Sequence, residues 1–140
     1  MALDFSSLKK ALSFFEQSMQ VTEEAPKNPA WNERFHQTLQ AGLIQHFEFT
    51  YELSWKFMKR WIVSEAGRRD AEGVSRRELF RIAKEEKLID DVTAWFEFHQ
   101  ARNLTSHTYN TDTAKEVAEA TKKFGPKARL LLSRLEEKNK

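Results

Sequence analysis

The chain has 140 residues, long enough to bury a core without disulfide bonds or metal ions, so we expect one domain spanning residues 1–140. The absence of cysteine excludes a disulfide framework, a thiolate zinc site and a cysteine nucleophile. With 23 basic against 21 acidic residues, the net charge of +2 is too small to attract nucleic acid by bulk electrostatics, so any such contact must be local.

The sequence contains few residues that interrupt helices, with four glycines and three prolines. Strand-like alternation of apolar and polar residues is also missing, so the pattern predicts an all-α protein. The apolar runs are too short to cross a membrane, and the first residues include Asp4 and no hydrophobic signal segment. We therefore expect a soluble, cytoplasmic protein.

The first predicted helix spans residues 4 to 21, and its apolar residues form one stripe, which is typical of a helix that packs on one side. The stripe consists of Phe5, Leu8, Leu12, Phe15 and Met19. The next segment, TEEAPKNP, predicts a loop. At its end, Asn28 followed by Pro29 predicts the cap and first turn of a second helix.

The second predicted helix reaches about Ala66 and is stopped by Gly67. Between residues 43 and 62, its apolar side chains extend nearly all the way round the helix. A helix in a small monomeric bundle buries only one face, so the surplus predicts a second contact surface, which we interpret as a homodimer interface. The remaining polar residues are Glu48, Glu52, Lys56 and Arg60. Their spacing of four is typical of a solvated ladder of salt bridges, and it also fits a surface that contacts a partner or substrate.

The densest basic stretch, GRRDAEGVSRRELFR, follows the second helix. Its arginines are Arg68, Arg69, Arg76, Arg77 and Arg81. They fit either a solvated loop and helix start or a phosphate-facing patch, in which Arg76 and Arg77 would contact RNA. Within this stretch, the spacing of Ser75 and Glu78 matches a capping box and predicts a short helix through about Lys87.

A fourth helix is predicted from a cap at Asp90 or Asp91 to about His107. One side would face the core and carries Ala94, Phe98, Ala101 and Thr105. The opposite side begins with Val92, Trp95 and Phe96 and continues with His99, Arg102, Asn103, Ser106 and His107. If this side meets the same side of a second protomer, the aromatic residues cover one end of the contact and the polar residues line a cleft.

The fifth predicted helix begins near residues 111 to 113. Its apolar stripe consists of Val117, Thr121, Phe124, Ala128, Leu131 and Leu135. Because this stripe stays in phase across Gly125 and Pro126, we expect a kinked but continuous helix there instead of a linker.

Arg102 and His107 lie about 140° apart around an ideal helix, so they would not converge within one chain. A twofold axis would bring two arginines and two histidines into one cleft. Arginine binds phosphate oxygens, and imidazole can take a proton from a 2′-hydroxyl and return one to a leaving oxygen. The cleft therefore predicts metal-free RNA cleavage without a cofactor. Asn103, four residues before His107, would orient the imidazole by a hydrogen bond.

The same residues also allow a structural interpretation. Arginine and histidine at the end of a helix commonly complement its macrodipole, and Tyr109 could be a packing residue. The histidines form no His-x-x-x-His pair, so the pattern does not indicate a metal site. The sequence also lacks a phosphate-binding glycine loop, a Gly-x-Ser-x-Gly motif and a Rossmann fingerprint.

The motif RNLTSHTY, at residues 102–109, resembles the signature of the metal-independent ribonucleases of the HEPN-domain family (higher eukaryotes and prokaryotes nucleotide-binding). The tyrosine at its end resembles the HepT toxin branch. Residues 47–62, 88–109 and the following TDTAKEV are similar in order and spacing to the nucleotidyltransferase substrate-binding protein family. At two turns the sequence departs from the family pattern, with Ser75 where a proline is expected and Lys87 where a glycine is expected.

This resemblance implies an antiparallel up-and-down four-helix bundle with an extra short helix, a homodimer, and a separately encoded minimal nucleotidyltransferase as partner. It implies that Arg102 and His107 cleave RNA. It also implies that the partner is an antitoxin that transfers AMP from ATP to Tyr109, which would add negative charge to the cleft and block RNA. The alternative is a non-catalytic subunit that presents substrate to the nucleotidyltransferase.

Overall fold

The computed structural model describes residues 3–28 and 30–139, which contain five α-helices and no β-strand. The helices are α1 (Ser6–Glu24), α2 (Glu33–Ser64), α3 (Arg76–Glu85), α4 (Val92–Leu104) and α5 (Thr111–Lys138). Short 3-10 turns occupy Ala25–Lys27, Arg69–Ala71 and Thr105–His107. The predicted all-α class is confirmed. Within the described residues, no helix combines the length and hydropathy needed to span a membrane.

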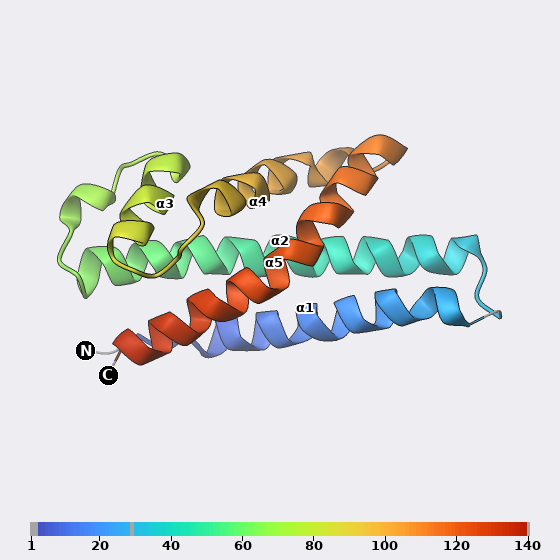
Figure 1. Cartoon of the computed structure of the whole chain (residues 1–140), viewed down its shortest axis with the longest axis horizontal. Coiled ribbons are helices and arrows are strands. Elements are labelled where there is room, and N and C mark those ends of the chain that lie inside the picture. The colour runs from blue at the N-terminus through green and yellow to red at the C-terminus, as the bar shows by residue number, and fades with distance from the viewer. Residues whose placement is uncertain (1–2, 29, 140) are drawn as a thin grey trace.

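The longer helices α1, α2, α4 and α5 run in alternating directions (Figure 1). The central helix is α2, which packs against each of the other four α-helices. This position explains why its apolar residues extend nearly all the way round, because most of them are buried inside the protomer. The additional apolar residues of α2, from which a dimer interface was predicted, are therefore mostly buried within one chain. Phe49 and Phe35 remain on the surface, at 59% and 48% exposed.

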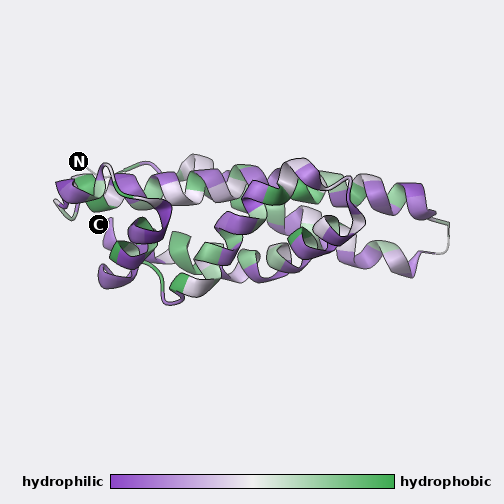
Figure 2. Ribbon diagram, turned by 90° about the horizontal axis from the view of Figure 1, so that it is seen from above, coloured by the Kyte–Doolittle hydropathy of each residue, from purple (hydrophilic) through white to green (hydrophobic). Residues whose placement is uncertain are grey.

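Phe124 of α5 lies at the centre of the core. Its ring meets those of Phe15, Phe47 and Phe98 edge to face, with centroids 5.4, 5.0 and 5.2 Å away. A fourth ring, Trp95, lies 5.8 Å away. These contacts connect α5 to α1, α2 and α4 through one buried side chain. Figure 2 shows hydrophobic and hydrophilic residues alternating along each helix, as expected of helices with one buried side.

The turn between α1 and α2 differs from the prediction. The cap of α2 is Asn32, whose side chain accepts a hydrogen bond from the Phe35 N–H at 3.1 Å. Asn28 instead accepts a bond from the Ala30 N–H inside the turn, and the predicted first-turn Pro29 lies outside the described residues. The predicted stop at Gly67 is confirmed, because this residue adopts φ +69° three positions after the last residue of α2, and the next N–H, that of Arg68, donates back to the Ile62 carbonyl oxygen at 3.0 Å.

The later boundaries agree closely with the sequence. Ser75 caps α3 by accepting a bond from the Glu78 N–H at 3.2 Å. Asp91 caps α4, whereas Asp90 binds Arg134 of α5 through both carboxylate oxygens. α5 continues through Pro126, so the predicted continuous helix is confirmed, and Figure 1 shows it changing direction near its middle.

Two further details concern the turns and the ends of the fold. Lys87 has φ +63°, in the left-handed region that favours glycine, which accounts for the glycine expected at this turn. The Asn139 side chain accepts a hydrogen bond from the Leu3 N–H at 3.0 Å and donates one to the Leu3 carbonyl oxygen at 2.8 Å. The two ends of the described chain are therefore fixed side by side.

Candidate functional site

The site predicted from the sequence lies where α4 ends. α4 stops at Leu104 and not at His107, and a 3-10 turn follows it. At this point the Thr105 hydroxyl donates to the Arg102 carbonyl oxygen at 2.8 Å and accepts a bond from Arg102 Nη1 at 3.1 Å. A threonine hydroxyl that binds the backbone in this way competes with the helical hydrogen bonds. Asn110 then caps α5, so residues 105–109 form a short, sharp connection.

Arg102 lies between two carboxylates of α2. Its Nε is 3.3 Å from Glu52 Oε1, and its Nη1 is 3.7 Å from Glu48 Oε2. The Nε–Glu52 contact is Coulombic, because this buried nitrogen makes no aligned hydrogen bond within the described residues. Two carboxylates and one guanidinium leave this group with a net negative charge in a single protomer.

The predicted salt-bridge ladder along α2 is wrong for the described residues. Glu48 and Glu52 turn towards Arg102 instead of pairing with Lys56 and Arg60. The ammonium nitrogen of Lys56 lies 5.7 Å from the Trp55 ring, and the guanidinium of Arg60 lies 5.3 Å from the Phe57 ring. Because α4 packs against α2, the arginine of the neighbouring helix takes both carboxylates.

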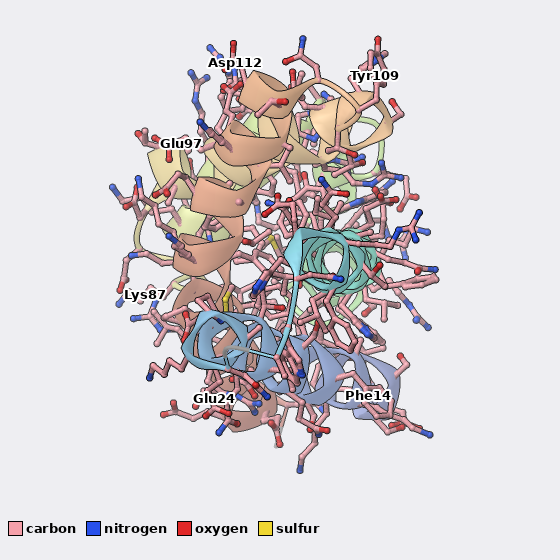
Figure 3. All side chains as sticks on the ribbon, turned by 90° about the vertical axis from the view of Figure 1, so that its right-hand side faces the viewer. Phe14, Glu24, Lys87, Glu97, Tyr109 and Asp112 are labelled. Atoms are coloured by element: carbon pink, nitrogen blue, oxygen red, sulfur yellow. The ribbon has the colours of Figure 1, made fainter. Side chains whose placement is uncertain are left out.

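His107 and Tyr109 are both exposed, and their ring centroids are 6.1 Å apart. The side chain of Tyr109 is 86% exposed and points away from the helices, as Figure 3 shows. The packing interpretation of Tyr109 is therefore wrong for the protomer. The phenol is accessible to a large molecule without any unfolding.

The predicted hydrogen bond between Asn103 and His107 is absent among the described side chains. The reason is the 3-10 turn, which advances about 120° per residue instead of the about 100° of an α-helix, so a spacing of four no longer aligns the two residues. No hydrogen bond or ion pair joins Arg102 to His107 within the described protomer either.

The first half of α4 differs from the prediction at one residue. Trp95 was expected on the outer side, but it is only 1% exposed and packs against Phe80 and Phe98 at 5.8 and 5.3 Å. It is buried because α3 covers this part of α4. Phe96 stays half-buried, with the Arg77 guanidinium 4.1 Å from its ring centroid. The predicted core positions Ala94, Phe98, Ala101 and Thr105 are all buried.

A second polar group lies beside Arg102. The hydroxyl of the buried Tyr51 is 2.9 Å from Nδ1 of His99. Burial raises the pKa of Tyr51, so its hydroxyl stays protonated. We assign this hydroxyl as the donor to Nδ1, because that gives the buried phenol proton an acceptor, and the ring proton of His99 then lies on Nε2. Burial, and next the charge of Arg76, lower the pKa of His99. The His99 ring is therefore neutral at neutral pH and offers an N–H donor.

The predicted phosphate contacts, Arg76 and Arg77, both lie on aromatic rings. The guanidinium of Arg76 is 3.2 Å from the Trp55 ring centroid, and burial lowers its pKa. Arg76 is half-buried, whereas Arg77 is exposed. The sequence did not identify Tyr51 or Trp55 as site residues, and it placed His99 among the polar residues of the cleft without giving it a role. The available signals were the spacing of four between Tyr51 and Trp55 and the position of His99 one turn before Arg102.

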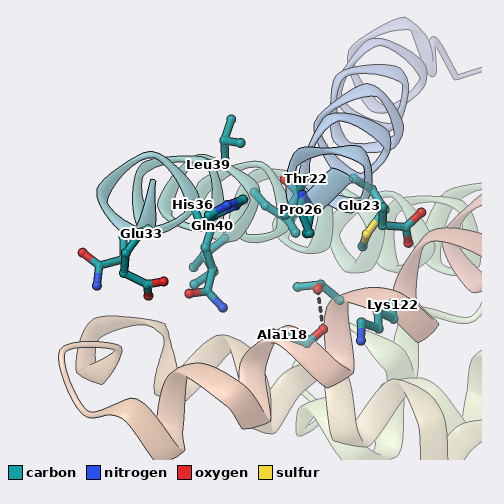
Figure 4. Close-up of a pocket in the computed structure, with 14 residues that line it drawn as sticks. Thr22, Glu23, Pro26, Glu33, His36, Leu39, Gln40, Ala118 and Lys122 are labelled. Carbon is teal, nitrogen blue, oxygen red and sulfur yellow. Dashed lines mark hydrogen bonds between the residues drawn. The ribbon is translucent and has the colours of Figure 1, made fainter. Parts of the chain in front are cut away.

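A separate pocket lies between the end of α1, the first half of α2 and α5 (Figure 4). Its volume is about 480 Å³, and its lining includes Met19, Thr22, His36, Leu43 and Lys122. It contains none of the residues predicted for the site. The described residues include no group of three or more His, Asp or Glu side chains that could hold a metal ion.

Comparison with known proteins identifies the family. Residues 3–137 match the family model described as "Nucleotidyltransferase substrate binding protein like". The chain belongs to this family. The family resemblance seen in the sequence is thus confirmed. Over 103 residues, which are 73% of this chain and 70% of the relative, it is 39% identical to the "Probable ribonuclease HepT" of Haemophilus influenzae.

Solved structures agree with the membership in the nucleotidyltransferase substrate-binding family. A structure from Haemophilus influenzae, described as the fold of a substrate-binding domain of a nucleotidyltransferase, superposes with a TM-score of 0.87. It is 32% identical and covers 95% of this chain and 99% of its own. A structure from Thermus thermophilus, 24% identical, shares the fold with a TM-score of 0.65 and covers 86% of this chain and 98% of its own.

Proposed function

We propose that this family member is the HEPN subunit of a two-component toxin–antitoxin system and that its homodimer cleaves RNA without a metal ion. The observation that carries this proposal is the exposed His107, in the 3-10 turn that follows the α4 residue Arg102 by five positions, in a chain 39% identical to a probable ribonuclease HepT. One HEPN-like domain over residues 1–140 would form each protomer.

The proposed site needs two protomers. Within one protomer Arg102 contacts Glu48, Glu52 and Thr105 but not His107. A twofold axis next to the end of α4 would place two arginines and two histidines around one anion-binding cleft. The exposed position of His107 supports this arrangement, because a second copy could approach it without rearranging the fold.

The proposed reaction uses the 2′-hydroxyl of the RNA as nucleophile. His107 takes the 2′-hydroxyl proton while the oxygen attacks the adjacent phosphorus. The bond from phosphorus to the 5′-oxygen breaks, and an imidazolium of the cleft returns a proton to that oxygen. The products are a 2′,3′-cyclic phosphate and a 5′-hydroxyl. Arg102 holds the phosphate oxygens and stabilises the negative charge that develops on them. Asn103, exposed beside Arg102, would support the site through contacts to RNA.

We further propose that a separately encoded minimal nucleotidyltransferase modifies Tyr109. The phenol oxygen would attack the α-phosphorus of ATP, pyrophosphate would leave, and the phenol proton would pass to a base of the partner enzyme. The 86% exposure of Tyr109 supports this step, because its oxygen can enter another active site. The attached AMP would add negative charge to the cleft that the two protomers form and exclude RNA.

A second candidate function is a non-catalytic subunit that presents substrate to the nucleotidyltransferase. It is favoured by the description of the related Haemophilus structure as a substrate-binding domain. The ion pairs of Arg102 with two glutamates also favour it, because they reduce the positive charge available to a phosphate.

One experiment separates the two functions. The protein is expressed alone and together with its nucleotidyltransferase, as wild type and as Arg102→Ala, His107→Ala and the control His36→Ala, which changes a histidine in the first turn of α2 that is not part of the proposed site. We expect growth arrest by the wild type and by His36→Ala, relieved by either site substitution or by the partner. Purified wild type should cleave RNA in EDTA. A dimer that neither arrests growth nor cleaves RNA would support the substrate-binding subunit.

The chain contains a matched control for the modification. Its two tyrosines are Tyr109, which is 86% exposed, and Tyr51, which is 1% exposed. After incubation with the partner and ATP, intact mass should show added AMP on the wild type and on Tyr51→Phe. The addition should be lost in Tyr109→Phe. AMP that persists in Tyr109→Phe would show that the acceptor is a different residue.

A further inference from the structure

Arg76 differs from the other half-buried arginines of the described chain in having no carboxylate partner. Arg68 lies 2.7 Å from Glu85, Arg102 lies 3.3 Å from Glu52, and Arg134 lies 2.8 Å from Asp90. No carboxylate of the described residues is within ion-pair distance of Arg76, and its buried Nε has no hydrogen-bond partner there. Glu52 acts on Arg76 only from beyond that distance and is itself paired with Arg102. A charge removed from water without a partner costs free energy, so this position favours an anion from outside the protomer.

The surroundings of Arg76 fix its guanidinium in place. One face lies on the Trp55 ring, 3.2 Å from the centroid, so the other face and the edge are the parts available to a ligand. The charge of Arg76 acts on both Tyr51 and His99, which share a hydrogen bond, and the opposite charge of Glu52 acts on all three residues. A planar cation supported by an aromatic ring and next to a neutral N–H donor is suited to a phosphate with an attached base.

This group continues the row of residues that leads to the proposed cleavage site. Phe96, His99 and Arg102 follow one another at intervals of three on α4, and the charge of Arg76 of α3 acts on His99. Arg102 contacts Glu52, and Arg76 lies on the ring of Trp55, whose indole N–H donates to Glu52 at 3.1 Å, so both arginines contact one short stretch of α2. A strand whose scissile phosphate is bound by Arg102 would therefore reach Arg76 with a neighbouring nucleotide.

We infer that Arg76, with Trp55 and His99, forms a second nucleotide-binding position for single-stranded RNA, next to the phosphate that Arg102 binds. This inference rests on the proposed ribonuclease function and names its substrate class. The Arg76 edge binds the phosphate, its free face stacks on an unpaired base, and His99 Nε2–H donates to the same nucleotide. Only an unpaired base can stack in this way, because the bases of a duplex are covered on both sides.

The test measures binding of a labelled single-stranded RNA and of its duplex by fluorescence anisotropy, with all variants in the His107→Ala protein so that the RNA stays intact. We expect Arg76→Gln to weaken single-strand binding about tenfold and to reduce the salt dependence by about one phosphate contact. Trp55→Leu should weaken binding and leave the salt dependence unchanged, because the charge remains. The control Arg81→Gln, in an exposed residue paired with Glu78, should bind like the parent.

The outcomes separate this inference from the function on which it rests. If Arg76→Gln binds RNA like Arg81→Gln while Arg102→Gln binds weakly, the second position is wrong and the ribonuclease proposal stands. If Arg102→Gln also binds RNA normally, both the second nucleotide position and the ribonuclease proposal are wrong. If the duplex binds as tightly as the single strand and is weakened equally by Arg76→Gln, the proposed stacking of an unpaired base on Arg76 is refuted. A variant that binds RNA normally but dissociates into monomers in sedimentation would show that Arg76 pairs with a second protomer.

Discussion

Replacing Phe124 by alanine tests whether one side chain holds the bundle together. Phe124 is fully buried, and its ring meets Phe15, Phe47, Trp95 and Phe98, which belong to three different helices. Truncation of a buried phenylalanine costs about 3–5 kcal/mol, and edge-to-face pairs add about 0.5–1.5 kcal/mol beyond the buried area. We therefore expect a loss of about 4–5 kcal/mol, a large part of the about 5–15 kcal/mol typical of a domain.

The assay is urea unfolding followed by circular dichroism at one fixed protomer concentration, because dimerisation would make the midpoint depend on concentration. Phe14→Ala is the matched control, since this phenylalanine is 46% exposed and its truncation should cost less than about 1 kcal/mol. Phe124→Leu keeps most of the volume and should cost about 1–2 kcal/mol. A Phe124→Ala loss below about 2 kcal/mol, or one no larger than that of Phe14→Ala, would refute this description of the core.

Three further predictions concern the turns and the site. Lys87→Gly should raise the free energy of unfolding by up to about 1 kcal/mol in urea titrations, because glycine adopts a positive φ without the steric strain of a side chain. A lower free energy of unfolding would show that Lys87 is not strained. Arg76→Gln should raise the pKa of His99 measured by NMR. The free energy of unfolding of the wild type should fall as pH drops below about 6.5, because His99 binds a proton more readily in the unfolded chain than in the folded one. This fall should be shallower in Arg76→Gln. Identical pH profiles would show that Arg76 does not influence the protonation of His99. Glu52→Gln should tighten RNA binding about threefold, because a carboxylate repels a phosphate about 7 Å away by about 0.6 kcal/mol in water; weaker binding would show that Glu52 mainly holds Arg102 in place.

The sequence predicted the helices well because their signals are local. The capping box at Ser75, the stop at Gly67 and the apolar stripe through Pro126 each act within a few residues, and the structure contains all three. The cap of α2 was misplaced because two asparagines, Asn28 and Asn32, flank the same turn. Only the folded structure shows that the Asn32 side chain accepts a hydrogen bond from the N–H three residues later.

The site was predicted less completely because its contacts join different helices. Spacing along one helix suggested that Glu48 and Glu52 pair along α2 and that Asn103 binds His107. The structure instead pairs both glutamates with Arg102 across the α2–α4 contact. The Asn103 prediction failed because the helix ends before His107. A prediction from periodicity assumes that the helix is unbroken and leaves out contacts with neighbouring helices.

The hydrogen bonds between Leu3 and Asn139 have a practical consequence for protein engineering. They hold the two ends of the described chain at one extremity of the molecule, whereas the turn between α4 and α5, which contains Tyr109, lies towards the other (Figure 1). A short linker between these ends, with new termini opened in the turn between α1 and α2, would give a circular permutant whose helices keep their neighbours. Fluorophores or affinity handles attached beside Leu3 would likewise leave the phenol free for a modifying enzyme.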